Sequence, residues 1–309
     1  GWAAGQYASG SNNTFVGQEA GQGGTTSAPF SSGEGNTAIG KAALDKFTTG
    51  DNNVAVGVNA LGALTTANNN IGIGGGAGDA ITTGEANIVI GSDAGGSITT
   101  DQYVTIVGYS AGQYMEAGNG NRYNSYFGAT AGYRGGPGIH QTYIGGEAGL
   151  YATGSENTFV GSQAGKGGQT SAPYSSGQKN VAVGYAAFDA FTTALQVTAI
   201  GHQAGSAITT GGYNTFVGAD AGQNVTTTMY SVGIGAEAAR SAGANSLIAI
   251  GYGALDATNS TDALGSIGIG HAALGSMQSG IGNVGIGYAA LAEEDDGDYN
   301  TAVGHQALT

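Results

Sequence analysis

A run of acidic residues near the end of the chain is the densest group of potential metal ligands in the sequence. Five carboxylates stand within six residues, at Glu293, Glu294, Asp295, Asp296 and Asp298. Carboxylate oxygens are ligands that Ca²⁺ prefers, but binding also requires a closed ligand geometry, which spacing alone does not establish. A solvated turn is the ordinary interpretation of such a run. We therefore expect no resident cofactor, with Ca²⁺ at these five residues as the alternative.

The histidines and the glycine-rich stretches do not form a recognisable catalytic group. His202, His271 and His305 are separated by at least one of the repeats described below, and His140 stands elsewhere. Metal ligands must converge to about 2 Å from the ion, so we expect these histidines to be exposed on the surface. The glycines of residues 72–78 look like part of a dinucleotide-binding fingerprint, but that motif needs a strand, a helix and an acidic residue about twenty positions on, and the repeat explains these glycines better. With neither a Ser-His-Asp order nor paired carboxylates on a shared scaffold position, the sequence predicts a protein that is not an enzyme.

Aromatic residues stand on segments that we expect to project as loops. Two long intervals share the sequence Thr-Ser-Ala-Pro before an aromatic residue, which is Phe30 in the first interval and Tyr174 in the second. A third segment, residues 113–123, holds Tyr114 and Tyr123. Exposed aromatic side chains on loops are typical of binding sites. These four residues are therefore the candidate receptor contacts, for a glycan or a protein.

One short unit recurs along the whole chain and must position all of these residues. Its form is Asn-Thr-Ala-Ile-Gly-Lys-Ala-Ala-Leu at residues 36–44, and copies follow every sixteen to twenty-three residues. We name the glycine of each copy the pivot glycine. The pivots are Gly1, Gly17, Gly40, Gly57, Gly74, Gly91, Gly108, Gly128, Gly145, Gly161, Gly184, Gly201, Gly218, Gly235, Gly251, Gly270, Gly287 and Gly304.

Positions around the pivot glycine have fixed residue types. The residue before the pivot is Val or Ile, except at Phe127, and we expect it to lie in the core together with the residue two positions earlier. The residue three positions after the pivot is always Ala, which leaves space for no more than a methyl group. Four positions after it, Gly and Leu alternate, and this column could face a neighbouring chain. Four positions before it, Asn recurs, and stacked Asn side chains could form a hydrogen-bonded ladder.

The repeat predicts an all-β parallel β-solenoid, or β-roll, with coils of about 17 residues. Seventeen residues cannot hold two helices, and the apolar pattern near the pivot has a period of two. The spacing of the pivots also shows a duplication. We expect a partial coil over residues 1–16 that continues an upstream array, eight-coil super-repeats over 17–160 and 161–303, and the start of a further coil over 304–309.

The composition of the chain limits the classes of partner that it is expected to bind. The chain has 7 Lys and Arg against 21 Asp and Glu, a net charge of −14, so electrostatic binding to nucleic acid is not expected. No apolar run is long enough for membrane insertion. Charged residues make up only 9% of the chain, and Asn, Thr, Ser and Gln must supply the polar surface. Such a surface is common on extracellular fibres.

The repeated motif resembles the head repeats of trimeric autotransporter adhesins, the YadA type, which are also similar to arrays in phage tail fibres. The copies at residues 36–44, 180–188 and 300–308 carry the resemblance, which spans nearly the whole chain. It implies a left-handed β-roll in a homotrimer, with chains intertwined or side by side. It also implies a structural fibre for surface attachment, on a virion as a tail fibre or on a cell surface as an adhesin shaft or head.

Two other functions are open from the sequence. A chain whose first and last residues belong to repeats could join end to end as a subunit of an extracellular filament. Thr-Thr pairs eight and nine residues after the pivot, such as Thr65-Thr66 and Thr82-Thr83, form columns that could order water, as in an ice-binding solenoid.

Overall fold

The computed structural model contains two compact units, Gly1–Glu156 and Asn157–Thr309. Every regular element in the described residues is a β-strand of three residues. The structure describes residues 1–24, 30–115, 122–168, 174–257, 263–293 and 295–309. Parts of the predicted loops, including Pro29 and Pro173, and the candidate ligand Glu294 lie outside these residues.

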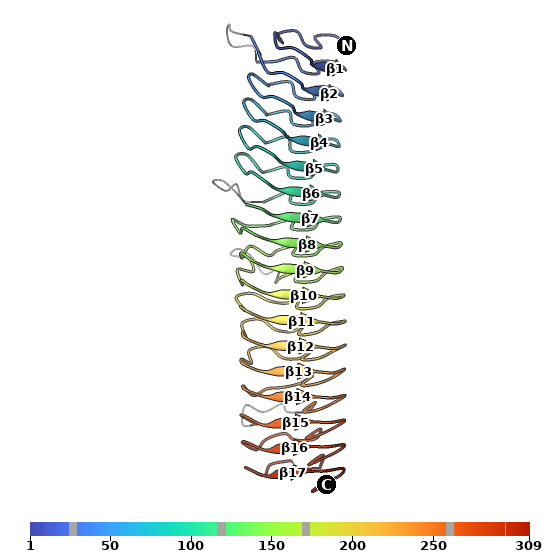
Figure 1. Ribbon diagram of the computed structural model, residues 1–309, viewed down its shortest axis with the longest axis vertical. Coiled ribbons are helices and arrows are strands. Elements are labelled where there is room, and N and C mark those ends of the chain that lie inside the picture. The colour runs from blue at the N-terminus through green and yellow to red at the C-terminus, as the bar shows by residue number, and fades with distance from the viewer. Residues whose placement is uncertain (25–29, 116–121, 169–173, 258–262, 294) are drawn as a thin grey trace. The chain divides into compact units, whose positions relative to one another are not determined.

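Each unit is a stack of coils that contribute one strand apiece, and consecutive strands pair in parallel (Figure 1). In the first unit the strands are β1 (Thr14–Val16), β2 (Thr37–Ile39), β3 (Val54–Val56), β4 (Ile71–Ile73), β5 (Ile88–Ile90), β6 (Thr105–Val107), β7 (Ser125–Phe127) and β8 (Thr142–Ile144). In the second unit they are β9 (Thr158–Val160), β10 (Val181–Val183), β11 (Thr198–Ile200), β12 (Thr215–Val217), β13 (Val232–Ile234), β14 (Ile248–Ile250), β15 (Ile267–Ile269), β16 (Val284–Ile286) and β17 (Thr301–Val303).

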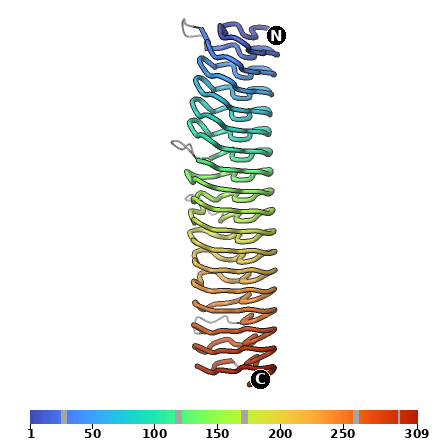
Figure 2. The backbone as a smooth tube through the Cα atoms, viewed as in Figure 1, coloured from blue at the N-terminus to red at the C-terminus, as the bar shows by residue number. Residues whose placement is uncertain are grey.

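Strand register follows the repeat. Val54 of β3 pairs with Ile71 of β4, which is the same position one copy later, 71 − 54 = 17 residues along the chain. Within each unit the backbone returns through the same turns in successive coils (Figure 2). The predicted all-β parallel β-solenoid with coils of about 17 residues is therefore confirmed for each unit.

The pivot glycine ends each strand in a conformation that other residues rarely adopt. Its φ lies between 129° and 144° in every strand-ending copy. A Cβ atom on Gly74 would lie 2.5 Å from the carbonyl oxygen of Gly91, the pivot of the next coil. Backbone therefore packs directly on backbone along this column, which confirms the role predicted for the glycine.

The prediction that the Val or Ile before the pivot lies in the core is wrong. Val16 is 55% exposed and Ile144 is 42% exposed, whereas the middle residues of strands, such as Ala38 and Tyr126, are fully buried. Because side chains alternate between the two sides of a strand, a strand of three residues has only one that points inward. The period correctly placed its first and third residues on one side, but that side is the outer one.

The Leu column four residues after the pivot is also part of the core and not a face for a neighbouring chain. In the copies before the last one its leucines are at most 1% exposed, at Leu44, Leu61, Leu255, Leu274 and Leu291, whereas Leu308 of the last copy is 65% exposed. In most coils one large side chain fills the interior, either from this column or from the middle of the strand. Where the strand supplies Tyr143, position 149 is Gly, and a Cβ there would lie 2.5 Å from the Tyr143 ring. Gly and Leu alternate because they complement the strand residue.

A further core column stands seven residues after the pivot and was missed from the sequence. Its buried members include Phe47, Leu64, Ile81, Ile98, Met115, Phe191, Ile208, Val225 and Met277. The signal was present, because an apolar residue precedes Thr-Thr in copy after copy. The Ala column is also buried, from Ala20 to Ala290, as the absence of any larger residue there predicted.

The predicted Asn ladder is confirmed. The Nδ2 group of Asn70 donates to the carbonyl oxygen of Gly84 at 2.9 Å, and its Oδ1 accepts the backbone N–H of Asn87 in the next coil at 3.0 Å. Asn70 is fully buried. One side chain thus satisfies a buried carbonyl and a buried N–H that the three-residue strands leave outside the sheet.

Candidate interaction surface

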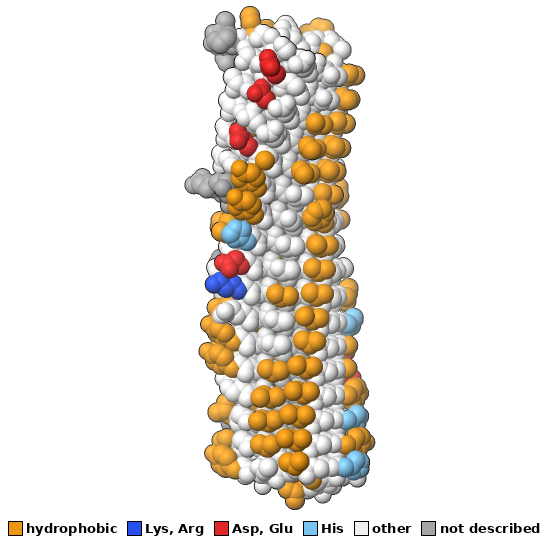
Figure 3. Space-filling model, in the orientation of Figure 1, with side chains coloured by type: hydrophobic (Ala, Val, Ile, Leu, Met, Phe, Trp, Pro, Cys, Tyr) orange, Lys and Arg blue, Asp and Glu red, His pale blue; other side chains and the backbone are white. Residues whose placement is uncertain are grey.

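The first and third residues of the strands form an outward surface, which we name the strand face. In the described strands no Asp, Glu, Lys, Arg or His stands at either position. The third residue is Val, Ile or Phe throughout, and Ile39, Ile200 and Ile234 are each about 40% exposed, at 41%, 38% and 41%. Hydrophobic side chains form rows over successive coils, while charged side chains lie beside them (Figure 3). The row of third residues is therefore apolar, the row of first residues is a mixture of Thr, Ser, Val and Ile, and the strand face is uncharged on a chain of net charge −14.

A ladder of rings stands five residues before the pivot, and we name it the turn ladder. In the first unit the rings of Tyr103 and Tyr123 stack with centroids 5.2 Å apart, and His140 follows at 5.7 Å. In the second unit Tyr213 and Tyr230 stack at 5.0 Å. All five residues have a positive φ between 52° and 61°, so their turns have the same left-handed conformation. A bulky residue in this conformation is uncommon, and stacking on its neighbour favours it here.

A second set of rings, the pivot ladder, comprises the aromatic residues directly after pivot glycines in the second unit. Tyr252, His271, Tyr288 and His305 form one continuous stack with centroid separations of 5.2, 5.0 and 5.0 Å. A separate pair in the same column stacks at 5.6 Å, Tyr185 with His202. The prediction that His202, His271 and His305 are exposed on the coil surface is confirmed. Their alternation with tyrosine was missed, although the shared position in the repeat made it visible in the sequence.

The candidate receptor contacts differ in how far neighbouring rings cover their faces. Phe30 is 52% exposed and stacks on Tyr7 with centroids 6.0 Å apart. Tyr123 lies between Tyr103 and His140 in the turn ladder, so both of its faces are covered.

The other two candidates have different surroundings. Tyr114 contacts Tyr133 edge to face at 5.1 Å, and the guanidinium of Arg134 lies over its ring at 5.3 Å. Tyr174 is half-buried. Within the first unit, Phe30, Tyr114 and Tyr123 therefore have separate ring partners and do not form one shared platform.

The described carboxylates of the acidic run do not converge on a metal site. Asp298 Oδ1 accepts the backbone N–H of Ile281 at 2.7 Å, so this side chain links two coils. Glu293, Asp295 and Asp296 are exposed. No group of three His, Cys, Asp or Glu residues that could hold a metal ion occurs in the described part of the chain.

The Thr-Thr columns take part in hydrogen bonds between coils. The hydroxyl of Thr65 donates to the carbonyl oxygen of Thr82 at 3.2 Å, and Thr82 donates in the same way to Thr99. In the second unit Thr192 donates to the carbonyl oxygen of Thr209 at 3.0 Å. The first hydroxyl of each of these pairs therefore has a structural acceptor. Ice binding stays a prediction, which inhibition of ice recrystallisation would test.

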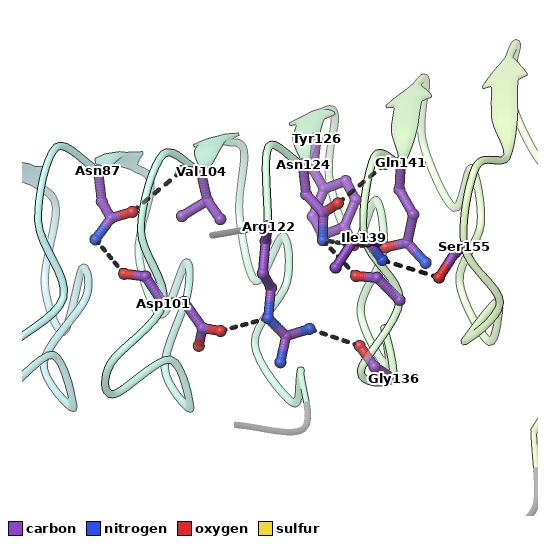
Figure 4. Close-up of polar contacts among 11 residues, drawn as sticks. Asn87, Asp101, Val104, Arg122, Asn124, Tyr126, Gly136, Ile139, Gln141 and Ser155 are labelled. Atoms are coloured by element: carbon purple, nitrogen blue, oxygen red, sulfur yellow. Dashed lines mark hydrogen bonds and ion pairs between the residues drawn. The ribbon is translucent and has the colours of Figure 1, made fainter. Parts of the chain in front are cut away.

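A buried polar network interrupts the Asn ladder between β5 and β8 (Figure 4). Arg122 is 2% exposed, forms an ion pair through Nε with Asp101 Oδ1, and donates from Nη1 to the carbonyl oxygen of Gly136 at 2.8 Å. Arg122 was predicted on a projecting loop, but its side chain is inside the coil. Tyr126 donates its hydroxyl to Gln141 Oε1, and burial raises the Tyr126 pKa. A hydroxyl in the core thus has a polar partner, as buried groups require.

Four aspartates five residues after the pivot share a desolvated environment. Burial raises the pKa of Asp45, Asp79, Asp189 and Asp256, and in each case it is the largest effect. Asp45 and Asp79 flank an open hollow of about 260 Å³ that Gly62 leaves between them. Nearby charges modify the shift, with Lys46 lowering the pKa of Asp45 and Asp93 raising that of Asp79.

The repeated coil, its parallel in-register strands and the Asn ladder place the chain in the structural class of parallel β-solenoids. Comparison with known protein families, with curated proteins and with solved structures finds no match. In the described residues, no helix has the length and apolar character that crossing a membrane would require.

Proposed function

We propose that this chain is a non-enzymatic structural fibre for surface attachment, outside the cell, as a phage tail fibre or a cell-surface adhesin. In this proposal three copies form a homotrimer of left-handed coils. The observation that supports it best is the strand face. A row of apolar third residues that recurs in every described strand and stays partly exposed in one chain is typical of a surface that associates with another chain.

Charge favours a second copy of the chain as the occupant of this face. Copies with a net charge of −14 repel one another, and the repulsion is smallest where no charged side chain is present. The strand face meets that condition in both units. Each apolar Å² covered contributes about 25 cal/mol, so a small gain per coil accumulates over successive coils.

The experiment is a measurement of mass in solution by light scattering, combined with electron microscopy. Replacing Ile200, Ile234 and Ile269 together with Lys puts three charges on the strand face and should dissociate the trimer. A matched control puts three Lys at the exposed Thr193, Thr210 and Thr227, which lie outside this face. A wild-type chain that is monomeric at micromolar concentration contradicts the trimer, and a polymer of unlimited length supports the filament instead.

Attachment to a receptor is a separate part of the proposal. Phe30, Tyr114, Tyr123 and Tyr174 are the candidate contacts, and the covered faces of Tyr123 favour recognition through its exposed edge and hydroxyl. Replacing all four by Ala should abolish binding to host cells while leaving the trimer intact. Unchanged binding would exclude these residues as receptor contacts.

A further inference from the structure

The four tyrosines of the turn ladder form two exposed pairs. Tyr213 and Tyr230 are 44% and 58% exposed, and their rings stack at 5.0 Å with an angle of 16° between the planes. Tyr103 and Tyr123 are 46% and 51% exposed, and stack at 5.2 Å with an angle of 3°. Each pair combines close contact between two phenols with access from solvent.

The backbone holds the second pair in register. Tyr213 and Tyr230 have φ values of 60° and 61°, so their side chains leave the two turns in the same direction. The N–H of Tyr230 donates to the carbonyl oxygen of Gly212, the residue before Tyr213, at 3.3 Å. Since both turns are fixed, neither ring needs a backbone change to stay beside the other. Both rings are half-exposed, so their edges are accessible from solvent.

We propose that each pair is a site of oxidative coupling to dityrosine, with a peroxide acting through a haem peroxidase as the oxidant. Each phenol loses one electron and its hydroxyl proton, which gives two phenoxyl radicals. The radicals combine through one Cε carbon of each ring, and the two hydrogens on these carbons move to the oxygens as the rings become aromatic again. One hydrogen peroxide accepts the two electrons and two protons and leaves as two water molecules.

Other tyrosines of the same chain have ring contact without solvent access, or solvent access without a stacked tyrosine partner. Tyr126 and Tyr143 stack at 5.0 Å with an angle of 4°, but both are fully buried, so an enzyme cannot reach them. Tyr299 occupies the same repeat position as the turn ladder and is 73% exposed, but its ring lies against Gly282. Coupling that needs stacked rings and solvent access should therefore occur at the turn-ladder pairs and at neither of these places. Tyr114 and Tyr133 are accessible but meet edge to face, with an angle of 83° between the ring planes, so they lack the stacked arrangement.

The product would join neighbouring coils of one chain. The bond between Tyr213 and Tyr230 closes a loop of one repeat, and that between Tyr103 and Tyr123 spans a longer one. Like other cross-links, it restricts the unfolded chain more than the folded one. A fibre exposed to peroxide would gain resistance to unfolding, and this inference does not depend on how many chains associate.

The experiment treats the folded full chain with haem peroxidase and hydrogen peroxide, and follows dityrosine fluorescence and peptide masses. Cleavage after Arg122 separates Tyr103 from Tyr123, and cleavage after Phe216 separates Tyr213 from Tyr230, so each bond appears as a joined peptide lacking two hydrogen atoms. The expected products are these two joined peptides in a chain that still migrates as a single chain on a denaturing gel.

Substitution by Phe retains the ring but removes the phenol. Tyr213→Phe should lose the second joined peptide alone, and combination with Tyr103→Phe should lose nearly all the fluorescence. The control Tyr299→Phe should retain it. The proposal would be overturned if the oxidised wild type contained neither joined peptide, or if dityrosine persisted in the double variant. Dityrosine between Tyr126 and Tyr143, or between separate chains, would overturn it as well.

Discussion

Coils filled by an aromatic strand residue differ from coils filled by leucine. In the coil of β9 the middle strand residue is Phe159 and position 165 is Gly, whereas in the coil of β16 the strand residue is Gly285 and Leu291 fills the interior. The large side chain is inside in both, but it comes from opposite walls of the coil. Each of the two interiors thus receives a large side chain while its source changes, as close packing requires of a repeated cross-section.

The comparison explains why the residue type at one position of the repeat does not show by itself which side chain fills the coil. A Gly in the middle of the strand can be interpreted only together with the residue four positions after the pivot, and the reverse also holds. These two positions are six residues apart in the sequence. Some interiors are completed by the preceding coil as well: a Cβ on Gly72 would lie 2.6 Å from Leu61 of that coil. Core volume is therefore shared along the stack and not fixed coil by coil.

The largest expected effect is at the feature that both kinds of coil share, the pivot glycine. Gly128→Ala places a Cβ 2.5 Å from the carbonyl oxygen of Gly145 at a φ of 140°. We expect a loss of about 3 kcal/mol or more in the free energy of unfolding, measured by urea denaturation. Gly146→Ala is the control, because no atom lies within 4 Å of its added Cβ. Equal stability of the two variants would contradict the role of the pivot.

The second prediction converts an aromatic-filled coil into a leucine-filled one. Phe159→Ala should cost about 3–5 kcal/mol because it leaves a cavity. Gly165→Leu alone should also destabilise, since its Cβ would overlap the Phe159 ring. The double variant should recover most of the loss, because Leu44 has the same φ of 53° as Gly165 and is tolerated there. Additive losses in a double-mutant cycle would show that the two walls are independent.

The third prediction concerns the polar partner that a tyrosine in the core requires. Gln141 accepts the Tyr126 hydroxyl and donates to the carbonyl oxygen of Gly154 at 2.6 Å, and the shorter Asn should lose the tyrosine contact. Gln141→Asn is expected to cost about 1–2 kcal/mol.

Adding Tyr126→Phe removes the hydroxyl that needs a partner and should restore stability. The coil of β9 already combines Phe159 with Asn157, whose Nδ2 donates to the carbonyl oxygen of Gly177 at 2.9 Å. No rescue in thermal unfolding of the double variant would mean that Gln141 acts through other contacts.

The sequence was sufficient for the repeat, the strand direction and the Asn ladder, because each depends on spacing along the chain. It was not sufficient to decide which side of a three-residue strand is inside, since Ala38 or Gly285 in the core has no hydrophobic signature. The strand face was consequently assigned to the core. The ladders of rings were missed for another reason, because stacking depends on residues at least sixteen positions apart that become neighbours only once coils are superposed.

The smallest effect should be a pH dependence from the desolvated aspartates, none of which stands in a coil filled by an aromatic strand residue. Burial raises the pKa of Asp189 above 3.8, its ordinary value, so the folded chain binds a proton more tightly than the unfolded chain. This contribution to stability is full below the unfolded pKa and is lost as pH rises through the folded pKa. Asp189→Asn cannot be ionised and should reduce the gain in stability seen on acidification from neutral pH towards pH 4. Asp296→Asn removes one exposed charge without desolvation and serves as the control. Identical pH profiles of urea midpoints for the two variants would mean that burial at this column does not affect proton binding.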